Sequence, residues 1–460
     1  MSTLSGILNT ARNSLLFEQL AMQVIGHNTA NVTTEGYSRK RLDGATSPAF
    51  TRTGQWIIGS GVHISNLGRI RDRLIDEQYR RTNTNLGYWS QYEDSLGQVE
   101  EIFNEFGAGA ISDQLQDFWD GWQDLANDPE STSARTALKS SAQTLASSLN
   151  RAHRNLSLKR EELDKEFMFQ VGDINRITQE IAELNVRIVD METATSEASD
   201  LRDQRDLLLD QLSEYAPVSV HENEDGAVNI YLNGQILVQV DHAETIGMAA
   251  HTSGNVTLHQ PLGPGTNAPL ELTQGKLAAT LAARDEAIPE AMAHLDTFST
   301  TLATEVNSRH VTGYGLTGTN GFDFWDANTT GAADIAVDSA IIFDPNLIAT
   351  SSSADAPGDN SVALWIGQLQ TERIMDGGAS TLSEYYTGFI TNIGTQTAAA
   401  SERRSTEEST INLLTERRQS VSGVSMDEEM ANLIRVQKSY EAAAKVVTTV
   451  DEMMQTVIAM

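Results

Sequence analysis

The most regular hydrophobic pattern lies at the two ends of the chain. Apolar residues recur there at spacings of three and four, which places them on one face of an α-helix. The N-terminal stripe predicts a helix of about seven turns, and a similar stripe runs from Met426 to Met460. The stripe residues are Leu4, Ile7, Leu8, Ala11, Leu15, Met22 and Ile25 at the N-terminus, and Met430, Leu433, Tyr440, Val447, Met454 and Ile458 at the C-terminus.

Each terminal stripe is too narrow to form a hydrophobic core by itself. The simplest interpretation is that the two terminal helices pack on each other, and the alternative is that each docks separately on a globular body. A regular helix at each extreme end, where chains usually fray, favours the pairing.

A sharp turn is predicted directly after the N-terminal helix. Asn28 and Asn31 tolerate the left-handed conformation that closes a helix, and Gly36 suits a second positive φ. We therefore expect a helix C-cap and a turn that ends near Lys40.

Long helices are predicted for most of the middle of the chain. Gly107-Ala108-Gly109, Pro129 and Pro217 separate them. The clearest heptad in the sequence, at spacings 3-4-3-4-3, is formed by Ile174, Ile177, Ile181, Leu184, Ile188 and Met191. The predicted helices span about 70–106, 111–126, 133–191, 201–212, 275–310 and 363–421.

Strand patterns are confined to shorter stretches. Residues 47–66 are typical of a strand–turn–strand linker. Glu224-Asp225-Gly226 and Asn233-Gly234 are strong hairpin signals between alternating segments, so a small β-domain is predicted within 218–272. The candidate strands are 218–222, 228–232 and 236–240, with two further candidates at 335–337 and 341–343.

Two short motifs resemble the paired signatures of a known family. Ala30-Asn31, Thr34 and Gly36-Tyr37-Ser38-Arg39 are similar to the Ala-Asn-x-x-Thr-x-Gly-Tyr-x-Arg signature of bacterial flagellar rod, hook and hook-associated proteins. The segment from Ser422 to Met430, followed by Gln437 and Tyr440-x-Ala442, resembles the C-terminal signature of the same family. The two signatures together are far more specific than either alone.

Further stretches resemble the members of this family that stand between hook and filament. They are the heptad at 174–191, the segment 201–212, Leu125-Ala126-Asn127-Asp128-Pro129 with Ala134-Arg135, and Ala142-Gln143-x-Leu145. The resemblance therefore covers nearly the whole chain.

The resemblance implies a structural subunit that forms the junction between hook and filament. The implied partners are other copies of the chain in a helical ring, the hook protein, a second hook–filament junction protein, and an export chaperone at the C-terminal helix. The implied assembly interface combines the signature turn with the terminal stripes: Leu4, Leu8, Leu15, Met22, Ile25, Asn31, Gly36, Tyr37, Met430, Leu433, Tyr440, Val447, Met454 and Ile458.

The predicted fold is thus mainly α with inserted β. It combines long terminal coiled-coil helices, a discontinuous helical-bundle domain and a small outer β-domain. We expect residues 1–40 and 424–460 to form the inner-tube coiled coil and 41–216 with 273–423 to form the helical domain. The β-domain would comprise 217–272, with 333–350 as an optional addition.

Composition narrows the choice of partner. With 32 basic and 63 acidic residues the net charge is −31, which argues against a nucleic acid or an anionic membrane. There is no cysteine, so disulfides and thiolate chemistry are excluded.

No apolar run approaches the roughly 20 residues of a membrane span, and the amphipathic stretch 3–20 is unlike a cleaved signal peptide. Taken alone this indicates a cytoplasmic protein, whereas the resemblance implies export through the flagellar channel to an extracellular location.

The sequence nominates no active site, cofactor or metal site. His242, His251 and His259 could cluster, but exposed loop positions are the better interpretation. The glycine-rich segment 313–321 lacks a phosphate-loop ending. Asp323 and Asp326 could hold Ca²⁺, but the order of an EF-hand is absent and a turn is favoured.

Three functions remain compatible with the sequence. A structural subunit of a tubular assembly fits the terminal stripes, the mid-chain β insertion and the absence of a catalytic constellation. An autonomous secreted helical adhesin or effector is the alternative, although it has no need for both terminal signatures. An enzyme is the weakest interpretation.

Overall fold

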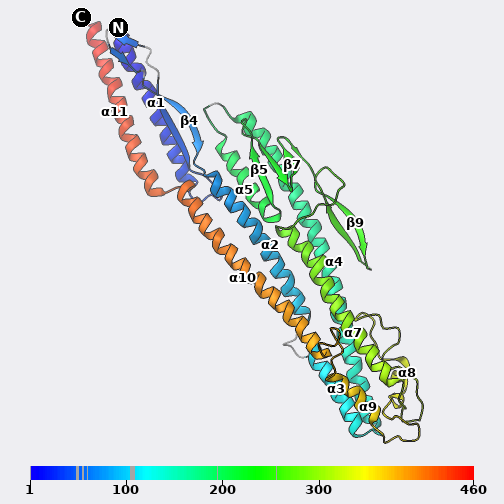
Figure 1. The fold of residues 1–460 in the computed structure, drawn as a ribbon. Coiled ribbons are helices and arrows are strands. Elements are labelled where there is room, and N and C mark those ends of the chain that lie inside the picture. The colour runs from blue at the N-terminus through cyan, green and yellow to red at the C-terminus, as the bar shows by residue number, and fades with distance from the viewer. Residues whose placement is uncertain are drawn as a thin grey trace.

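The computed structural model describes residues 2–47, 51–53, 56–59, 61–103, 109–193, 195–254 and 256–459. Met1, Met460, the Gly107-Ala108 part of the predicted break and parts of the 47–66 stretch lie outside these residues. The molecule is a long rod whose two chain ends lie together at one end (Figure 1). The predicted class, mainly α with inserted β, is confirmed.

The two terminal helices pack side by side, as predicted. Helix α1 (Ser2–Ala30) and helix α11 (Met426–Ile458) run together along the terminal end of the rod (Figure 1). Their buried apolar residues are Ala11, Val24 and Ile25 on α1 and Val436, Ala443 and Val450 on α11, the latter three at intervals of seven. This spacing is that of a coiled-coil seam.

An antiparallel hairpin covers another side of α1. Strand β1 (Lys40–Thr46) pairs with β4 (Val62–Arg69), with a bulge between Asp43 and Gly44. Within the predicted strand–turn–strand stretch, β2 (Thr51–Thr53) and β3 (Trp56–Ile58) form a second small pair. The hairpin leads the chain from the signature turn into the first helix of the body.

A second helix pair connects the terminal end with the far end. Helix α2 (Arg73–Phe103) and helix α10 (Leu382–Ser422) lie side by side over much of their length (Figure 1). The capping box of Thr381 and Glu384 begins α10.

The far end holds a large aromatic core, which we call the far core. It packs α3 (Ile111–Asn127), the first half of α4 (Thr132–Met191), α7 (Ile288–His310) and α9 (Ser361–Gly367) against one another. Its largest fully buried side chains include Phe118, Trp119, Trp122, Phe324 and Trp325. The aromatic face of α3, with Phe118 and Trp122, is therefore part of this core.

A smaller middle core lies between the far core and the terminal end. The heptad half of α4 packs there against α5 (Ser199–Tyr215), α6 (Lys276–Ala282) and a four-stranded antiparallel sheet. Of the heptad residues, Met191 alone is largely exposed. The sheet strands are β5 (Val218–Glu222), β6 (Val228–Leu232), β7 (Gln235–Gln239) and β8 (His242–Ala243).

The hairpin turns of the sheet form where the sequence predicts them. Gly226, Asn233 and Gly234 all adopt positive φ, at 86°, 48° and 79°. A further hairpin, of β9 (Gly247–Ser253) and β10 (Val256–Leu262), is one that the sequence pattern does not predict.

Two sequence predictions are wrong in the region after the glycine-rich turn. Residues 341–343 lie in helix α8 (Ser339–Phe343), because the Asp338 side chain accepts a hydrogen bond from Ala340 N and caps a helix start. A short 3₁₀ turn (Pro345–Leu347) follows. Ile335, Ile341 and Ile348 are buried in the far core, so 333–350 does not extend the β-sheet.

The helical run predicted for 363–421 is interrupted. Helix α9 ends at Gly367, a 3₁₀ turn follows (Gln368–Gln370), and α10 begins only at Leu382. Between them Asp376, Gly377 and Gly378 all adopt positive φ, a conformation that no α-helix contains. Similarly, a five-residue π-helical segment (Ala283–Ala287) separates α6 from α7 within the predicted helix 275–310.

Candidate assembly site at the joint

The signature turn forms a compact C-cap after α1. Asn31 donates a side-chain hydrogen bond to His27 O at 2.9 Å, and Thr34 Oγ1 donates to Asn31 Oδ1 at 3.2 Å. Gly36 adopts a φ of 76°, which favours glycine. The turn therefore ends α1 and reverses the chain as the sequence predicts.

Asn28 fixes the return of the chain alongside α1. Its buried side chain donates to Lys40 O at 3.0 Å and accepts from Lys40 N at 2.9 Å, as a neighbouring strand would. Tyr37 Oη donates to Asn28 Oδ1 at 2.7 Å. Burial, reinforced by nearby carboxylates, raises the pKa of Tyr37 well above its usual range, so the hydroxyl stays a donor.

Arg39 joins the two signature segments. Its guanidinium contacts Glu428 Oε2 at 2.7 Å and Glu429 Oε1 at 2.8 Å, and its backbone N donates to Ser422 O at 2.8 Å. Glu429 is almost fully buried and also accepts from Asn28 Nδ2 at 3.2 Å. The motif after α1 and the motif that begins α11 are thus one contact surface in space.

Helix α5 contributes the acidic half of a charge network beneath this contact. Asp203 accepts from Ser38 N at 2.9 Å and Ser38 Oγ at 2.7 Å, and it pairs with Arg69 at 2.8 Å. One turn further along, Asp206 pairs with Arg69 at 2.6 Å and Arg80 at 3.1 Å. Helix α5 therefore holds the signature turn in place.

The network continues to α10. Arg418 contacts Asp210 at 2.7 Å and Asp76 at 2.8 Å, and Asp210 also pairs with Arg80 at 2.8 Å. Arg71 bridges Asp76 at 3.0 Å and Asp206 at 3.5 Å.

We call the contacts of Arg39 together with this network the joint. Its further members are Ser38, Arg69, Arg71, Asp76, Arg80, Asp203, Asp206, Asp210, Arg418, Glu428 and Glu429.

The charges of the joint are mutually dependent. Burial alone would raise the pKa of Asp206, but Arg69, Arg71, Arg80 and Arg205 outweigh it and hold that pKa well below its usual range. Because several arginines share one carboxylate, removing that carboxylate would take one of two partners from each of Arg69, Arg71 and Arg80.

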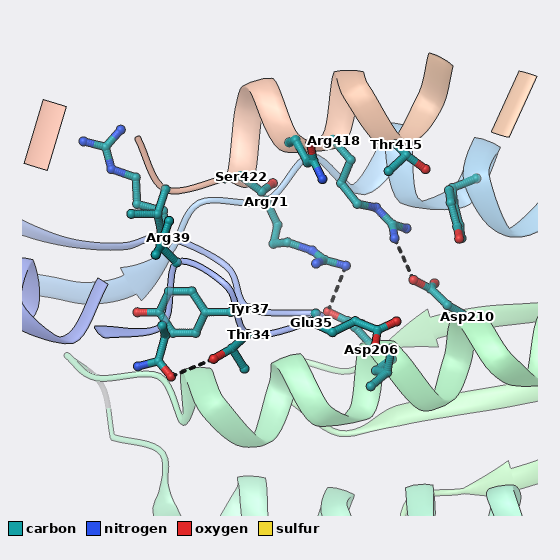
Figure 2. A pocket seen from close by; sticks show the side chains of 18 of the residues that line it. Thr34, Glu35, Tyr37, Arg39, Arg71, Asp206, Asp210, Thr415, Arg418 and Ser422 are labelled. Atoms are coloured by element: carbon teal, nitrogen blue, oxygen red, sulfur yellow. Dashed lines mark hydrogen bonds and ion pairs between the residues drawn. The ribbon is translucent and has the colours of Figure 1, made fainter. Parts of the chain in front are cut away.

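A polar groove of about 760 Å³ runs along the joint. It lies between the turn at 31–37, helix α5 and the end of α10. Figure 2 shows Arg71 and Arg418 reaching across this groove towards Asp206 and Asp210. Charged side chains that line this groove pair with charged side chains of neighbouring helices. This arrangement suits a joint that fixes the orientation of those helices.

The predicted interface residues fall into two sets. Leu4, Leu15, Met22, Asn31, Gly36, Tyr37, Leu433 and Val447 are half-buried, and Ile25 is buried. A more exposed set comprises Leu8, Met430, Tyr440, Met454 and Ile458, with Ile458 reaching 82% exposure. The α11 seam itself is formed by Val436, Ala443 and Val450, which the predicted stripe does not include.

Sequence reasoning misses the charged residues of the joint. A signal is present, because Asp203, Asp206 and Asp210 recur at spacings of three and four and so share one face of α5. Their arginine partners are distributed over β4, α2 and α10, and no spacing rule connects them.

The described part of the chain shows no metal cluster. No group of three or more His, Asp or Glu side chains in it could hold a metal ion. His242 pairs with Glu244 and His259 with Asp164, so these histidines contact different carboxylates. The segment 313–321 forms a turn closed by a bridge between Tyr314 and Asn320. No helix among the described residues is long and apolar enough to cross a membrane.

The terminal helices are thus paired and Arg39 joins their two signature segments, and the sequence matches family models of flagellar axial structural proteins. Residues 96–325 match the family model described as "Flagellar hook-associated protein FlgK helical domain". Residues 417–460 match the model "Flagellar basal body rod FlgEFG protein C-terminal".

Individual proteins agree with these matches. The chain is 30% identical to flagellar hook-associated protein 1 of Bacillus subtilis, over 99% of this chain and 98% of that protein. It is 24% identical to flagellar hook-associated protein 1 of Escherichia coli, over 99% and 100%. The solved structure of the flagellar hook junction protein FlgK from Burkholderia pseudomallei has the same fold, with a TM-score of 0.67 at 17% identity, covering 75% of this chain and 100% of that one.

The chain therefore belongs to the flagellar hook-associated protein 1 family. It is a structural protein of the hook–filament junction in the extracellular flagellum, and not an enzyme.

Proposed function

We propose that this subunit forms a helical ring whose inner wall is built from α1 and α11. The hook protein would dock on one side of the ring and a second hook–filament junction protein on the other. Residues 1–40 and 424–460 would form the tube-lining domain, with the helical domain (41–216 and 273–423) and the β-domain (217–272) placed outside it.

The observation that carries this proposal is the apolar surface left open by the α1–α11 pair. Ile7 and Leu16 on α1 and Ile434, Val446 and Met453 on α11 are all well exposed, although both helices already share a buried seam. On α11, Val446 and Met453 are seven residues apart and share one side of the helix, and exposed apolar side chains grouped on one side of a soluble protein usually mark an interaction surface. Two helices with further apolar faces can each contact a neighbouring subunit.

The predicted interface residues fit two roles in such a ring. Leu433 and Val447 are half-buried and would support the helix pair, whereas Met430, Tyr440, Met454 and Ile458 are open to neighbours. Asn31, Gly36 and Tyr37 would act through the joint, by setting the direction in which the pair leaves the body.

The joint supplies the mechanical part of the proposal. A junction subunit must present the same tube-lining helices to two different neighbours while its outer body keeps a fixed direction. Buried, mutually compensated ion pairs have geometric requirements that apolar packing lacks, so they define one orientation. The network from Arg39 to Arg418 would hold the helix pair at that orientation.

The proposal extends to export. The exposed apolar side chains of α11 would promote self-association before assembly, so a chaperone that covers this helix is expected. Export would proceed through the flagellar channel without a cleaved signal peptide.

Deletion of the gene followed by electron microscopy of the cells tests the junction role. The expected result is hooks without filaments and flagellin in the medium. Normal filaments on the deletion strain would refute the proposal.

A matched pair of substitutions tests the tube-lining surface. Met453→Asp places a charge on the exposed apolar face of α11, and Thr448→Asp adds the same charge at an exposed polar position of the same helix. Because both positions are exposed in the subunit, both variants should fold. We expect Met453→Asp to abolish swimming and Thr448→Asp to retain it, with the exported amount of each protein measured in the medium.

A further inference from the structure

The middle of α4 carries an exposed face that its own chain leaves uncovered. Phe169 is 76% exposed and Leu158 is 56% exposed. Arg151, Arg154 and Lys165 are also exposed, and the five residues follow spacings of three, four, seven and four, which places them on one side of the helix. We call these five residues the α4 stripe.

The charge of the α4 stripe is unusual for this protein. The chain has a net charge of −31, and the arginines of the joint are all engaged with carboxylates. Within the described residues, by contrast, Arg151, Arg154 and Lys165 form no ion pair. Two acidic residues lie on the same side: Glu162 pairs with Lys159 at 3.1 Å, and Glu161 is half-buried between Leu158 and Lys165, so the positive charges of the stripe still outnumber the negative ones. The stripe therefore places two exposed apolar side chains, Leu158 and Phe169, among three positive ones along one side of α4.

A complementary face exists on α3. Asp113, Asp117, Asp120 and Asp124 recur at spacings of four and three, are exposed, and form no ion pair among the described residues. The opposite side of α3 is buried in the far core through Phe118 and Trp122. The acidic face is thus rigidly presented and directed away from the core.

We propose that the α4 stripe of one subunit binds the acidic α3 face of a second copy of the same chain. The proposal rests on the ring formation described above and names a lateral contact in its outer layer. Because the two faces are different surfaces of one chain, the contact is heterologous and can repeat from copy to copy around a ring or helix.

The positions of the two faces fix the axial shift between neighbours. Gly121 of α3 lies against Leu138 of α4, where an added Cβ would come within 3.1 Å of the leucine Cδ1. Leu158 lies twenty residues further along α4 than Leu138, which is a rise of about 30 Å at 1.5 Å per residue. Two parallel copies joined through these faces are therefore staggered by about 30 Å, which builds a helical rather than a flat ring.

Disulfide trapping tests both the contact and its register. The chain contains no cysteine, so Asp120→Cys and Leu158→Cys introduce the only thiols. Within one chain these positions are about 30 Å apart along the rod, too far for a disulfide. A bond between them can only join two copies.

The experiment uses flagella isolated from cells in which the double variant replaces the wild-type chain. After mild oxidation we expect a ladder of dimers and larger species on non-reducing gels that collapses on reduction. Each single variant should remain monomeric. The register control, Asp120→Cys with Glu183→Cys, places the second thiol on exposed α4 about 38 Å beyond Leu158 and should give no ladder.

Two results overturn the proposal. One is the absence of a ladder from flagella that contain the double variant, and the other is a ladder of equal strength from the register control. Both results concern the lateral contact alone. Failure of the proposed junction role would instead appear as normal filaments in the deletion strain.

Charge reversal provides a second measurement if the double variant does not reach the flagella. Arg154→Glu with Lys165→Glu should lower the swimming fraction at least several-fold, and adding Asp117→Lys with Asp120→Lys in the same chain should restore it. Wild-type swimming of the first variant, or failure of the second pair to restore it, refutes the contact.

Discussion

The joint and the far core hold the same rod together by opposite means. The far core is an aromatic cluster in which Phe118, Trp122 and Phe324 bury almost all their surface. The joint is a chain of charge pairs in which Arg69, Arg80 and Arg418 contact aspartates at 2.6–3.1 Å. Apolar burial is strong but has little directional preference, whereas a buried ion pair contributes less net stability and more geometry. We infer that the far core supplies most of the stability and that the joint sets the direction of the terminal helices.

The largest expected effect comes from the far core. Trp122→Ala removes a fully buried ring that contacts Phe118 and Phe324, and should lower the free energy of opening of α3 and α9 by about 4 kcal/mol. Hydrogen exchange resolved by segment measures this, and α1 should retain its protection. The matched control, Trp365→Ala, removes a half-exposed ring beside Arg309 and should cost about 1 kcal/mol. Equal effects would mean that the aromatic cluster is not the dominant source of stability.

A smaller loss of stability, confined to the terminal end of the rod, is expected from a substitution in the joint. Asp206→Asn keeps the shape of the side chain but leaves Arg69 and Arg80 with one carboxylate partner each instead of two, so exchange protection of the signature turn should fall by about 3 kcal/mol. The far core should be unaffected. Asp200→Asn is the control, because Asp200 is exposed and, among the residues that the structure describes, pairs only with Lys40 and His27; less than about 1 kcal/mol is expected. A uniform loss across the rod would contradict the separation of the two regions.

Acid should weaken the far core through one residue. His310 is fully buried; its Nδ1 donates to Phe322 O at 2.7 Å and its Nε2 accepts from Ala349 N at 2.8 Å. Burial, with Arg135 nearby, lowers its pKa to about 4. The unfolded histidine binds a proton below about pH 6.5, so stability is complete above that value and is lost as pH falls towards 4.

Between pH 7 and pH 5 this linkage amounts to about 2 kcal/mol. Hydrogen exchange of residues 345–351 at the two pH values measures it. His310→Gln cannot titrate and should show a flat response over the same range. If the wild-type response were as flat as that of the variant, protonation of His310 would not be the cause of acid destabilisation.

The smallest expected effect concerns backbone conformation in the signature turn and in α1. Gly36→Ala forces a side chain into a φ of 76° and should destabilise the signature turn by about 1 kcal/mol. Gly26→Ala, inside α1 with no atom within 4 Å of the added Cβ, should stabilise the isolated subunit by about 0.5–1 kcal/mol. Thermal melting of the two variants checks the opposite signs.

The sequence is most informative where one local pattern decides the structure. Asn233-Gly234 can form a hairpin with both residues at positive φ, and the Ile174–Ile188 heptad can only be a helix with a buried stripe. It is least informative where tertiary contacts decide. Ile341 and Phe343 have strand propensity, but the Asp338 cap and burial of Ile341 in the far core make a helix.

The candidate site shows the same division. The two signatures are recognisable and their turn chemistry follows from Asn31 and Gly36, yet the stripe pattern misassigns the seam of α11. Leu433 and Val447 share a face close to that of Val436 and Val450, and only the position of α1 decides which face is buried. The charge network joins residues more than a hundred positions apart, and no single-sequence pattern encodes such pairs.

Helix α4 is one uninterrupted element of 60 residues, and its two halves belong to two different cores. At about 1.5 Å per residue it extends for roughly 90 Å. Mechanically it is a strut, because bending it anywhere along this length would disturb packing in the far core or the middle core. A twisting force applied to the rod therefore travels along covalently continuous, hydrogen-bonded backbone, without crossing a flexible connection.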